Sequence, residues 1–187
     1  MPHPRRSDAL RNREAILNAA REVLAQPRTP ISLERVARVA RVGQATVYRH
    51  FPDRRALVLA VVSDQIAAFA RLAASRADEA AAFRSLLDTV LQAQLAMRPL
   101  VHTLRGLPPD QQRRHIDQVV ALLAAPLSRA PAAGHVRADL GPADLTLVLT
   151  MAEAVIDTTA DNPNHLVLAQ RAIALLLDSL LPRTAPP

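Results

Sequence analysis

The sequence contains no cysteine, so it forms no disulfide, thiolate metal site or catalytic thiol. It has no lysine or tryptophan, and only one tyrosine and three phenylalanines. With so few aromatic side chains, a core must be built from leucine, valine and alanine. Only four glycines occur, and no long stretch alternates apolar with polar residues. The composition therefore favours an all-α fold over a β-sheet protein.

Two further absences concern membranes. The first eight residues, MPHPRRSD, lack the apolar core of a signal peptide. Uncharged apolar runs in the C-terminal half fall short of the roughly 18 residues that a membrane span needs. Half of the 187 residues are apolar and 21% are charged, which is typical of a globular protein with one sizeable core or two small ones. We therefore expect a cytoplasmic protein without a membrane segment.

Positive charge is concentrated in the N-terminal third of the chain. Residues 1–60 hold 12 Arg and 5 acidic residues, a net charge of +7. Residues 61–187 hold 11 Arg and 12 acidic residues, a net charge of −1, and the two sum to the +6 of the whole chain. A basic end on a nearly neutral body indicates that this end meets a polyanion. Arginines that only line a solvated face are the alternative.

Residues 32–51, SLERVARVARVGQATVYRHF, carry the most specific pattern in the chain. In the first half, apolar residues recur at intervals of three and four and so share one face of a short helix: Leu33, Val36, Ala37 and Ala40. The pattern breaks at 41–43, and a second helix is expected over 44–51. Two helices joined by such a short turn form a helix-turn-helix, whose second helix enters the major groove of DNA.

This stretch resembles the DNA-binding segment of the tetracycline-repressor (TetR) family, whose pattern is roughly Ala-Gly-Val-Ser-x-Gly-Thr-Leu-Tyr-x-His-Phe-x-x-Lys-x-x-Leu. The chain meets it at Ala40, Val42, Thr46, Tyr48, His50, Phe51 and Leu57, and has Arg54 where the family has Lys. It departs at three positions, where Arg41 replaces the turn glycine, Gly43 the capping serine and Ala45 a glycine. Glycine is itself an acceptable N-cap, so these departures weaken the turn without forbidding it.

The expected DNA contacts lie on the second helix and at the helix starts around it. The Gln44 amide can form a two-pronged pair with adenine, and a solvated first-turn Gln is the alternative. Tyr48 and His50 resemble the family's phosphate-contacting pair. Arg38 and Arg41 flank the turn, where each could read guanine or bind a phosphate. The candidate DNA-binding residues are Ser32, Arg38, Arg41, Gln44, Ala45, Thr46, Tyr48, Arg49, His50 and Arg54.

The whole pattern predicts an all-α protein with two domains. A three-helix helix-turn-helix DNA-binding domain is expected over 1–53, and an effector-binding and dimerisation domain over 54–187. A long helix that starts at Pro52-Asp53 joins them without a flexible linker. Further helices are expected over 78–98, 99–104, 109–127, 142–160 and 163–181, the last two with Pro142 and Pro163 as first residues. Pro126 is expected to kink its helix or end it early.

The last two expected helices are apolar nearly all round, so each must be buried on several sides. One domain of this size has little interior left for both. We therefore expect their spare faces to form a two-fold four-helix interface in a homodimer, as in the resembled family, and a central hairpin in a monomer is the alternative. The candidate interface residues are Leu145, Val148, Ala152, Val155, Leu166, Ile173, Leu176, Leu177 and Leu180.

The resemblance also implies a small-molecule effector pocket between the helices of the body. The candidate lining residues are Gln94, Met97, His102, Leu104, His115, Val119, Met151, Glu153 and Asp157. Ordinary core or surface positions are the alternative for each. The scarcity of aromatic residues argues against a pocket built on stacking and favours a medium-sized apolar ligand.

No catalytic motif is present, and the histidines are scattered without metal-ligand spacing. We expect no enzyme activity, metal or cofactor. The sequence is interpreted as a DNA-binding transcriptional regulator: a repressor that binds an inverted-repeat operator in double-stranded DNA as a dimer and is released by a small apolar effector. A helix-turn-helix regulator without a small-molecule ligand and an orphan ligand-binding helical dimer are the alternatives.

Overall fold

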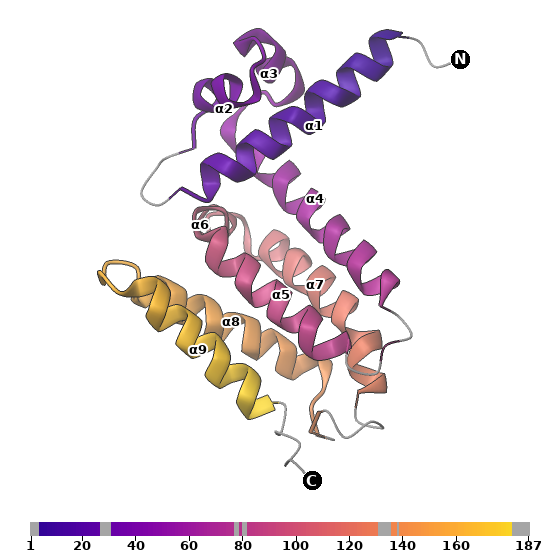
Figure 1. Ribbon diagram of the computed structural model, residues 1–187, viewed down its shortest axis with the longest axis vertical. Helices are drawn as coiled ribbons and strands as arrows, with labels where there is room; N and C mark the ends of the chain where they lie inside the picture. The colour runs from indigo at the N-terminus through magenta and orange to yellow at the C-terminus, as the bar shows by residue number, and fades with distance from the viewer. Residues whose placement is uncertain are drawn as a thin grey trace. The chain divides into compact units, whose positions relative to one another are not determined.

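The computed structural model describes residues 4–26, 31–76, 79, 82–130, 136–137 and 139–180, without the side chains of 4–7, 99, 102 and 103. The described residues form nine α-helices and no β-strand (Figure 1), which confirms the all-α prediction. The helices are α1 (Pro4–Leu24), α2 (Leu33–Ala40), α3 (Gln44–His50), α4 (Arg54–Ser75), α5 (Ala82–Ala96), α6 (Arg98–Arg105), α7 (Pro109–Arg129), α8 (Pro142–Thr158) and α9 (His165–Leu180).

The chain forms two compact units. The first comprises Met1–Gln65 and Pro99–Gly106, and the second comprises Ile66–Arg98 and Leu107–Pro187. Helix α4 therefore contributes residues to both units. The predicted domain boundary between residues 53 and 54 stays a prediction, because the helix that starts there belongs partly to each unit.

In the first unit, α1 packs on α2 and α3, and α2 packs on α3. The buried side chains of this unit include residues of all three helices and of the start of α4: Ile16, Leu17, Ala20, Val23, Leu24, Leu33, Val36, Ala37, Val47, Phe51, Leu57, Val58 and Val61. The guanidinium of Arg13 lies over the Phe51 ring, 5.8 Å from its centroid, and Arg21 forms an ion pair with Asp64. The helix-turn-helix is thus fixed on a core that its own residues help to build.

Helix α4 is long and apolar enough, by length and composition alone, to cross a membrane. In this structure, however, Leu57, Val58 and Val61 are fully buried in the first unit. Asp64, on the same helix, pairs with Arg21 of α1. The apolar residues in this half of α4 are therefore explained by the core of the first unit.

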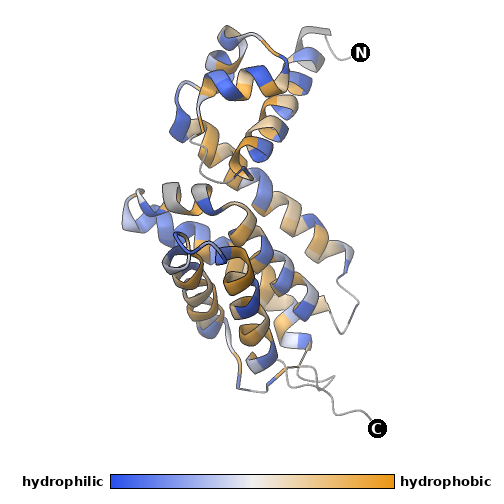
Figure 2. Ribbon diagram, turned by 60° about the vertical axis from the view of Figure 1, so that its left-hand side comes forward, coloured by the Kyte–Doolittle hydropathy of each residue, from blue (hydrophilic) through white to orange (hydrophobic). Residues whose placement is uncertain are grey.

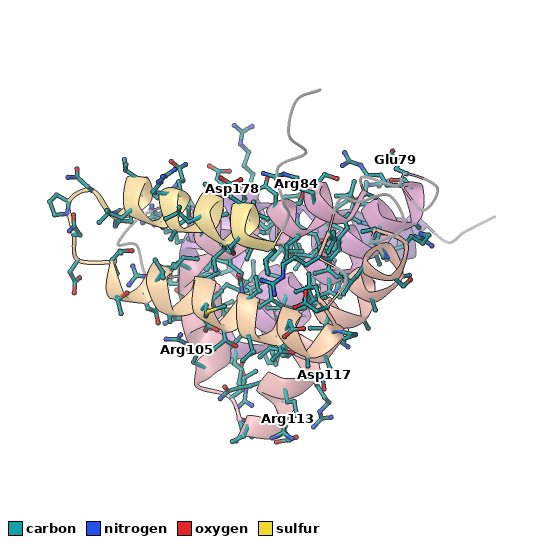
Figure 3. All side chains as sticks on the ribbon, turned by 90° about the horizontal axis from the view of Figure 1, so that it is seen from below. Glu79, Arg84, Arg105, Arg113, Asp117 and Asp178 are labelled. Carbon is teal, nitrogen blue, oxygen red and sulfur yellow. The ribbon has the colours of Figure 1, made fainter. Side chains whose placement is uncertain are left out.

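In the second unit, α5 packs on α7, α8 and α9, while α8 packs on α7 and forms an antiparallel pair with α9 (Figure 1). Their buried apolar residues form one core that includes Phe83, Leu87, Leu91, Leu123 and Leu145. At its surface, Arg84 of α5 and Asp178 of α9 lie side by side (Figure 3), with 3.3 Å between the Arg84 Nη2 and Asp178 Oδ1 atoms. These contacts hold the four helices as one bundle.

Two predictions about helix ends at prolines are wrong. Helix α7 does not end early at Pro126 but continues to Arg129, while the alternative, a kink at Pro126, stays a prediction. Pro126 lies in the last turn, where its missing N–H removes only one helical hydrogen bond, and its ring is buried in the core. Pro163 does not open the last helix, which begins at His165. The side chain of Asn162 accepts a hydrogen bond from the Asn164 N–H at 2.8 Å and closes a turn there.

Candidate DNA-binding surface

Helix α2 begins at a side-chain cap. Ser32 has an extended backbone (φ −128°, ψ 149°), and its Oγ accepts a hydrogen bond from the Arg35 N–H at 3.2 Å. This bond satisfies one of the free N–H groups of the first turn. The apolar face of α2, with Leu33, Val36 and Ala37, is buried. Glu34 and Arg38, on the other side, are exposed.

Helix α2 ends in a left-handed turn at Arg41 (φ 55°, ψ 38°). The Val42 N–H donates to the Ala37 carbonyl at 3.1 Å, and the Arg41 N–H donates to that of Arg38 at 3.2 Å. These two hydrogen bonds together form the Schellman motif, in which glycine usually takes the left-handed position. Among the described residues, Arg41 is the only non-glycine residue with a positive φ. The turn therefore forms as predicted, with an arginine in the conformation that glycine prefers.

Helix α3 is held by one side and exposed on the other. Gly43 is its N-cap residue, and its carbonyl accepts a hydrogen bond from the Thr46 N–H at 2.9 Å. Val47 and Phe51, one turn apart, are buried in the core of the first unit. The exposed side chains of α3 occupy positions that neighbour each other on the helix surface: Gln44, Ala45, Tyr48 and Arg49. This outward face is the part of α3 that is free to enter a groove.

Tyr48 makes a contact between helices that the sequence did not suggest. Its hydroxyl donates a hydrogen bond to the Glu34 Oε1 atom of α2 at 2.7 Å, although 44% of Tyr48 is exposed. The hydrogen bond from Tyr48 is the main cause of a lowered pKa of Glu34. The same bond raises the pKa of Tyr48. Sequence reasoning missed Glu34, because a contact between residues 14 positions apart on different helices has no periodic signal.

All ten candidate DNA-binding residues belong to the first unit. Ser32, Thr46 and His50 are half-buried, and the other seven are exposed. Arg49 folds back on its own helix, with its Nε atom 3.1 Å from the Ala45 carbonyl oxygen. Beside Arg54, the Asp53 carboxylate accepts a hydrogen bond from the Ala56 N–H at 2.7 Å. This cap explains why α4 starts where the sequence predicted.

The candidate pocket residues make different kinds of contact. In the second unit, the Gln94 amide donates to the Leu149 carbonyl at 3.5 Å, while its Oε1 atom and the Nδ1 atom of His115 are buried without a hydrogen-bond partner. Asp157 forms an ion pair with Arg98 across 3.7 Å. Val119 lines an apolar cavity of about 10 Å³ with Phe69, Ala73, Leu86, Val90, Leu122 and Leu123. That volume holds about one water molecule and no medium-sized ligand.

The predicted pocket stays a prediction, and its residues differ in exposure and in the unit they belong to. Met151, on α8, is 48% exposed. Leu104 belongs to the first unit, whereas Gln94 and His115 belong to the second. The side chain of His102 lies outside the described residues. Met97, Glu153 and Asp157 are half-buried in the second unit.

The predicted dimer interface stays a prediction, and its residues differ in burial. Five of its residues are at most 5% exposed because they fill the core of their own unit: Leu145, Val148, Ala152, Ile173 and Leu177. They have no surface left for a partner. Val155, Leu176 and Leu180 are half-buried, and Leu166 is 53% exposed. The sequence analysis missed the other exposed apolar residues of α8 and α9: Leu147, Met151, Val167, Leu168 and Leu175.

No group of three or more His, Asp or Glu side chains within the described part of the chain could hold a metal ion.

Comparison with known proteins identifies the region that contains the helix-turn-helix. Residues 16–61 match the family model of bacterial regulatory proteins of the tetR family. The fold is similar to a TetR transcription regulatory protein from Mycobacterium vanbaalenii, at 29% identity and a TM-score of 0.69 over 95% of this chain and 99% of that one. It is equally similar to the TetR transcriptional regulator SCO0520 from Streptomyces coelicolor, at 29% identity, a TM-score of 0.69 and 92% and 99% coverage. No curated protein matches the chain.

Proposed function

Because the chain belongs to the TetR family of transcriptional regulators, we propose that it represses transcription: it binds an inverted-repeat operator as a homodimer and is released by a small effector. As a bacterial regulator of this kind it acts in the cytoplasm, where the DNA is. The observation that carries the proposal is the outward face of α3, with Gln44, Ala45, Tyr48 and Arg49 exposed opposite the buried Val47.

The residues of this face divide between base reading and phosphate binding. Gln44 stands in the first turn of α3, where a side chain reaches base edges, and its amide suits adenine. Arg38, Arg41 and Arg54 are exposed at the ends of α2 and α4, and their charge suits phosphates. Base contacts specify the operator, while phosphate contacts supply affinity on every sequence.

Two variants test this division on DNA that the purified protein selects from its genome. Gln44→Ala is expected to change the preference at one base pair by about 1–3 kcal/mol. Arg54→Ala is expected to weaken binding to all duplexes alike. It should also reduce the slope of the logarithm of affinity against the logarithm of salt concentration by about 1. An equal loss on every sequence for Gln44→Ala would refute its role as a base reader.

The homodimer is supported by the surface of the second unit. Helices α8 and α9 are rich in hydrophobic residues, as the colouring of Figure 2 shows. After their inner faces are buried, these helices still expose large apolar side chains: Leu147, Met151, Leu166, Val167, Leu168 and Leu175. Such a concentration of exposed apolar residues marks a protein interface, and a second copy of the chain is the proposed partner.

Sedimentation at micromolar concentration tests the dimer. The double variant Leu147→Asp/Leu175→Asp places charge on both helices and is expected to sediment as a monomer that remains helical. Leu10→Asp is the matched control, since Leu10 is 66% exposed on α1, outside the proposed interface. A wild-type protein that is monomeric would refute the dimer and favour a hairpin that serves only its own chain.

The proposed effector is a mainly apolar molecule with one or two hydrogen-bonding groups. Buried polar atoms without partners are costly, at about 1–3 kcal/mol each, and Gln94 Oε1 and His115 Nδ1 are such atoms in the second unit. The second unit must open to admit the ligand, because the cavity of about 10 Å³ between α4, α5 and α7 is too small. Moving a conformational equilibrium from 1:99 to 99:1 takes about 5.5 kcal/mol of differential affinity.

Thermal shift with fractionated metabolite extracts tests for the effector, with Gln94→Met as the variant. Methionine fills a similar volume without an unpaired oxygen, so the variant is expected to be more stable when free and to lose the shift. Leu149→Met, a volume-conserving change in the same core, should keep it. A wild-type protein that no fraction shifts, but that binds its upstream DNA, would favour the regulator without a small-molecule ligand.

A further inference from the structure

Glu34 is the only acidic residue in the stretch 32–51, which otherwise carries four arginines. It lies in the first turn of α2 and is exposed. Its Oε1 atom accepts a hydrogen bond at 2.7 Å from the hydroxyl of Tyr48, which lies on the outward face of α3. A negative charge therefore lies in hydrogen-bond contact with the face that is proposed to meet a polyanion.

The Tyr48 hydroxyl cannot donate a hydrogen bond to Glu34 and to a phosphate at the same time. A tyrosine hydroxyl carries one hydrogen. While that hydrogen is donated to Glu34, the hydroxyl has none to donate to a phosphate oxygen. The Ser32 side chain also helps to lower the pKa of this carboxylate. Glu34 stays ionised at neutral pH and repels phosphates that approach.

The contact is not needed to hold α2 against α3. Val36 and Val47 are fully buried in the core that the two helices share with α1. The backbone bonds of the left-handed turn at Arg41 already fix the connection. A single exposed hydrogen bond adds little to such a unit. The consequence of the Glu34–Tyr48 bond is therefore to be sought in DNA binding.

We propose that Glu34 competes with the DNA backbone for the hydroxyl of Tyr48 and thereby lowers the affinity of the protein for duplex DNA of any sequence. The inference rests on the proposed function, because it takes the outward face of α3 as the DNA-binding face. Glu34 acts here as a positioning residue: it holds Tyr48 in a state that does not bind phosphate and releases it when DNA binds. Weak binding to non-operator DNA is the expected benefit for a repressor.

The test compares the full-length wild type with Glu34→Ala, Tyr48→Phe and the double variant. Binding is measured by fluorescence anisotropy on the selected operator and on an unrelated duplex of equal length, at two salt concentrations. Glu34→Ala is expected to bind both duplexes about three- to tenfold tighter. Tyr48→Phe in the Glu34→Ala background should remove most of this gain, and the substitution should cost more affinity there than it costs in the wild type. This non-additivity is the signature of competition.

Two controls make the result specific. Glu22→Ala removes the same charge from an exposed position on α1 of the same unit and should bind like the wild type. Glu34→Gln keeps a hydrogen-bond acceptor for the Tyr48 hydroxyl without the charge, so it should gain less affinity than Glu34→Ala. Thermal melting of every variant confirms folding.

The outcomes separate this inference from the function on which it rests. A wild-type protein that binds no duplex DNA would overturn both. A wild-type protein that binds, with Glu34→Ala no tighter, would overturn the competition alone. A gain of equal size with and without the Tyr48 hydroxyl would overturn it as well, because Glu34 would then act through its charge and not through Tyr48.

Discussion

At the scale of single residues, Arg41 is where side chain and backbone conflict most. Its left-handed conformation costs an L-residue about 1–2 kcal/mol, a cost that glycine does not have. The side chain is exposed at the end of α2 and makes no use of the core. The position is therefore explained better by a need for charge at the DNA-binding surface than by the stability of the turn.

Arg41→Gly is expected to stabilise the free protein by about 0.5–1 kcal/mol, since relief of the backbone outweighs the greater freedom of glycine in the unfolded chain. The same variant should bind all duplexes more weakly, and the slope of the logarithm of affinity against the logarithm of salt concentration should fall by about 1. The midpoint of urea unfolding at an unchanged m value measures the first effect. Arg41→Ala is the control, because it removes the charge but keeps the conflict, so it should lose affinity without gaining stability.

Tyr48 can be followed alone, because it is the only tyrosine and the chain has no tryptophan. The bond to Glu34 raises the pKa of Tyr48. Its contribution to stability is therefore complete below the usual tyrosine pKa and is lost as the pH rises through the raised value. The bond lowers the pKa of Glu34, so the carboxylate's contribution is present above the usual glutamate range and is lost as the pH falls through the lowered value.

An ultraviolet titration of the phenolate in the absence of DNA should give a Tyr48 pKa above that of free tyrosine. In Glu34→Ala this pKa should fall toward the usual value. Glu22→Ala should leave it unchanged. An identical titration for the wild type and Glu34→Ala would mean that the hydrogen bond at 2.7 Å is not maintained in solution.

At the scale of helices, periodic patterns predicted where each element lies but not always which face it buries. In α2, apolar and charged residues alternate with helical period, so the buried face follows directly from the spacing of Leu33, Val36 and Ala37. In α8 and α9 large apolar residues occur among the polar residues on the exposed faces. The sequence could therefore not show that Leu145 and Ile173 point into their own core while Leu147 and Leu175 remain exposed.

The site follows the same logic. The motif predicted the residues of α3, because a turn and a short helix are local features. The bond from Tyr48 to Glu34 and the buried polar atoms of Gln94 and His115 depend on how separate helices meet. Tertiary packing decides such contacts, and local spacing carries no information about them.

The start of α4 depends on a side-chain cap that can be tested by itself. The Asp53 carboxylate bonds the Ala56 N–H at 2.7 Å, so Asp53→Ala is expected to cost about 1 kcal/mol of unfolding free energy. Asp53→Asn keeps a capping oxygen and should cost much less. Urea denaturation of both variants measures the difference. Equal losses would show that the charge at the helix N-terminus, and not the hydrogen bond, stabilises α4.

At the scale of the whole molecule, charge and apolar surface are separated along the chain. The N-terminal residues 1–60 carry a net charge of +7, whereas the rest carries −1. The large exposed apolar residues of α8 and α9 all lie in the second unit. One part of the chain thus suits a polyanion and the other suits the proposed second copy, which would give the proposed repressor two DNA-binding units.

The consequence for DNA is a dependence on half-site spacing. A dimer that holds both half-sites gains from the effective concentration of the second unit, by about 10²–10⁴-fold over a single half-site. Inserting about five base pairs between the half-sites turns one of them to the opposite side of the duplex and should remove that gain. Leu147→Asp/Leu175→Asp should bind the intact operator, the spaced operator and a single half-site equally, and Leu10→Asp should behave like the wild type. A wild-type protein indifferent to the insertion would mean that each α3 reads DNA independently of any partner.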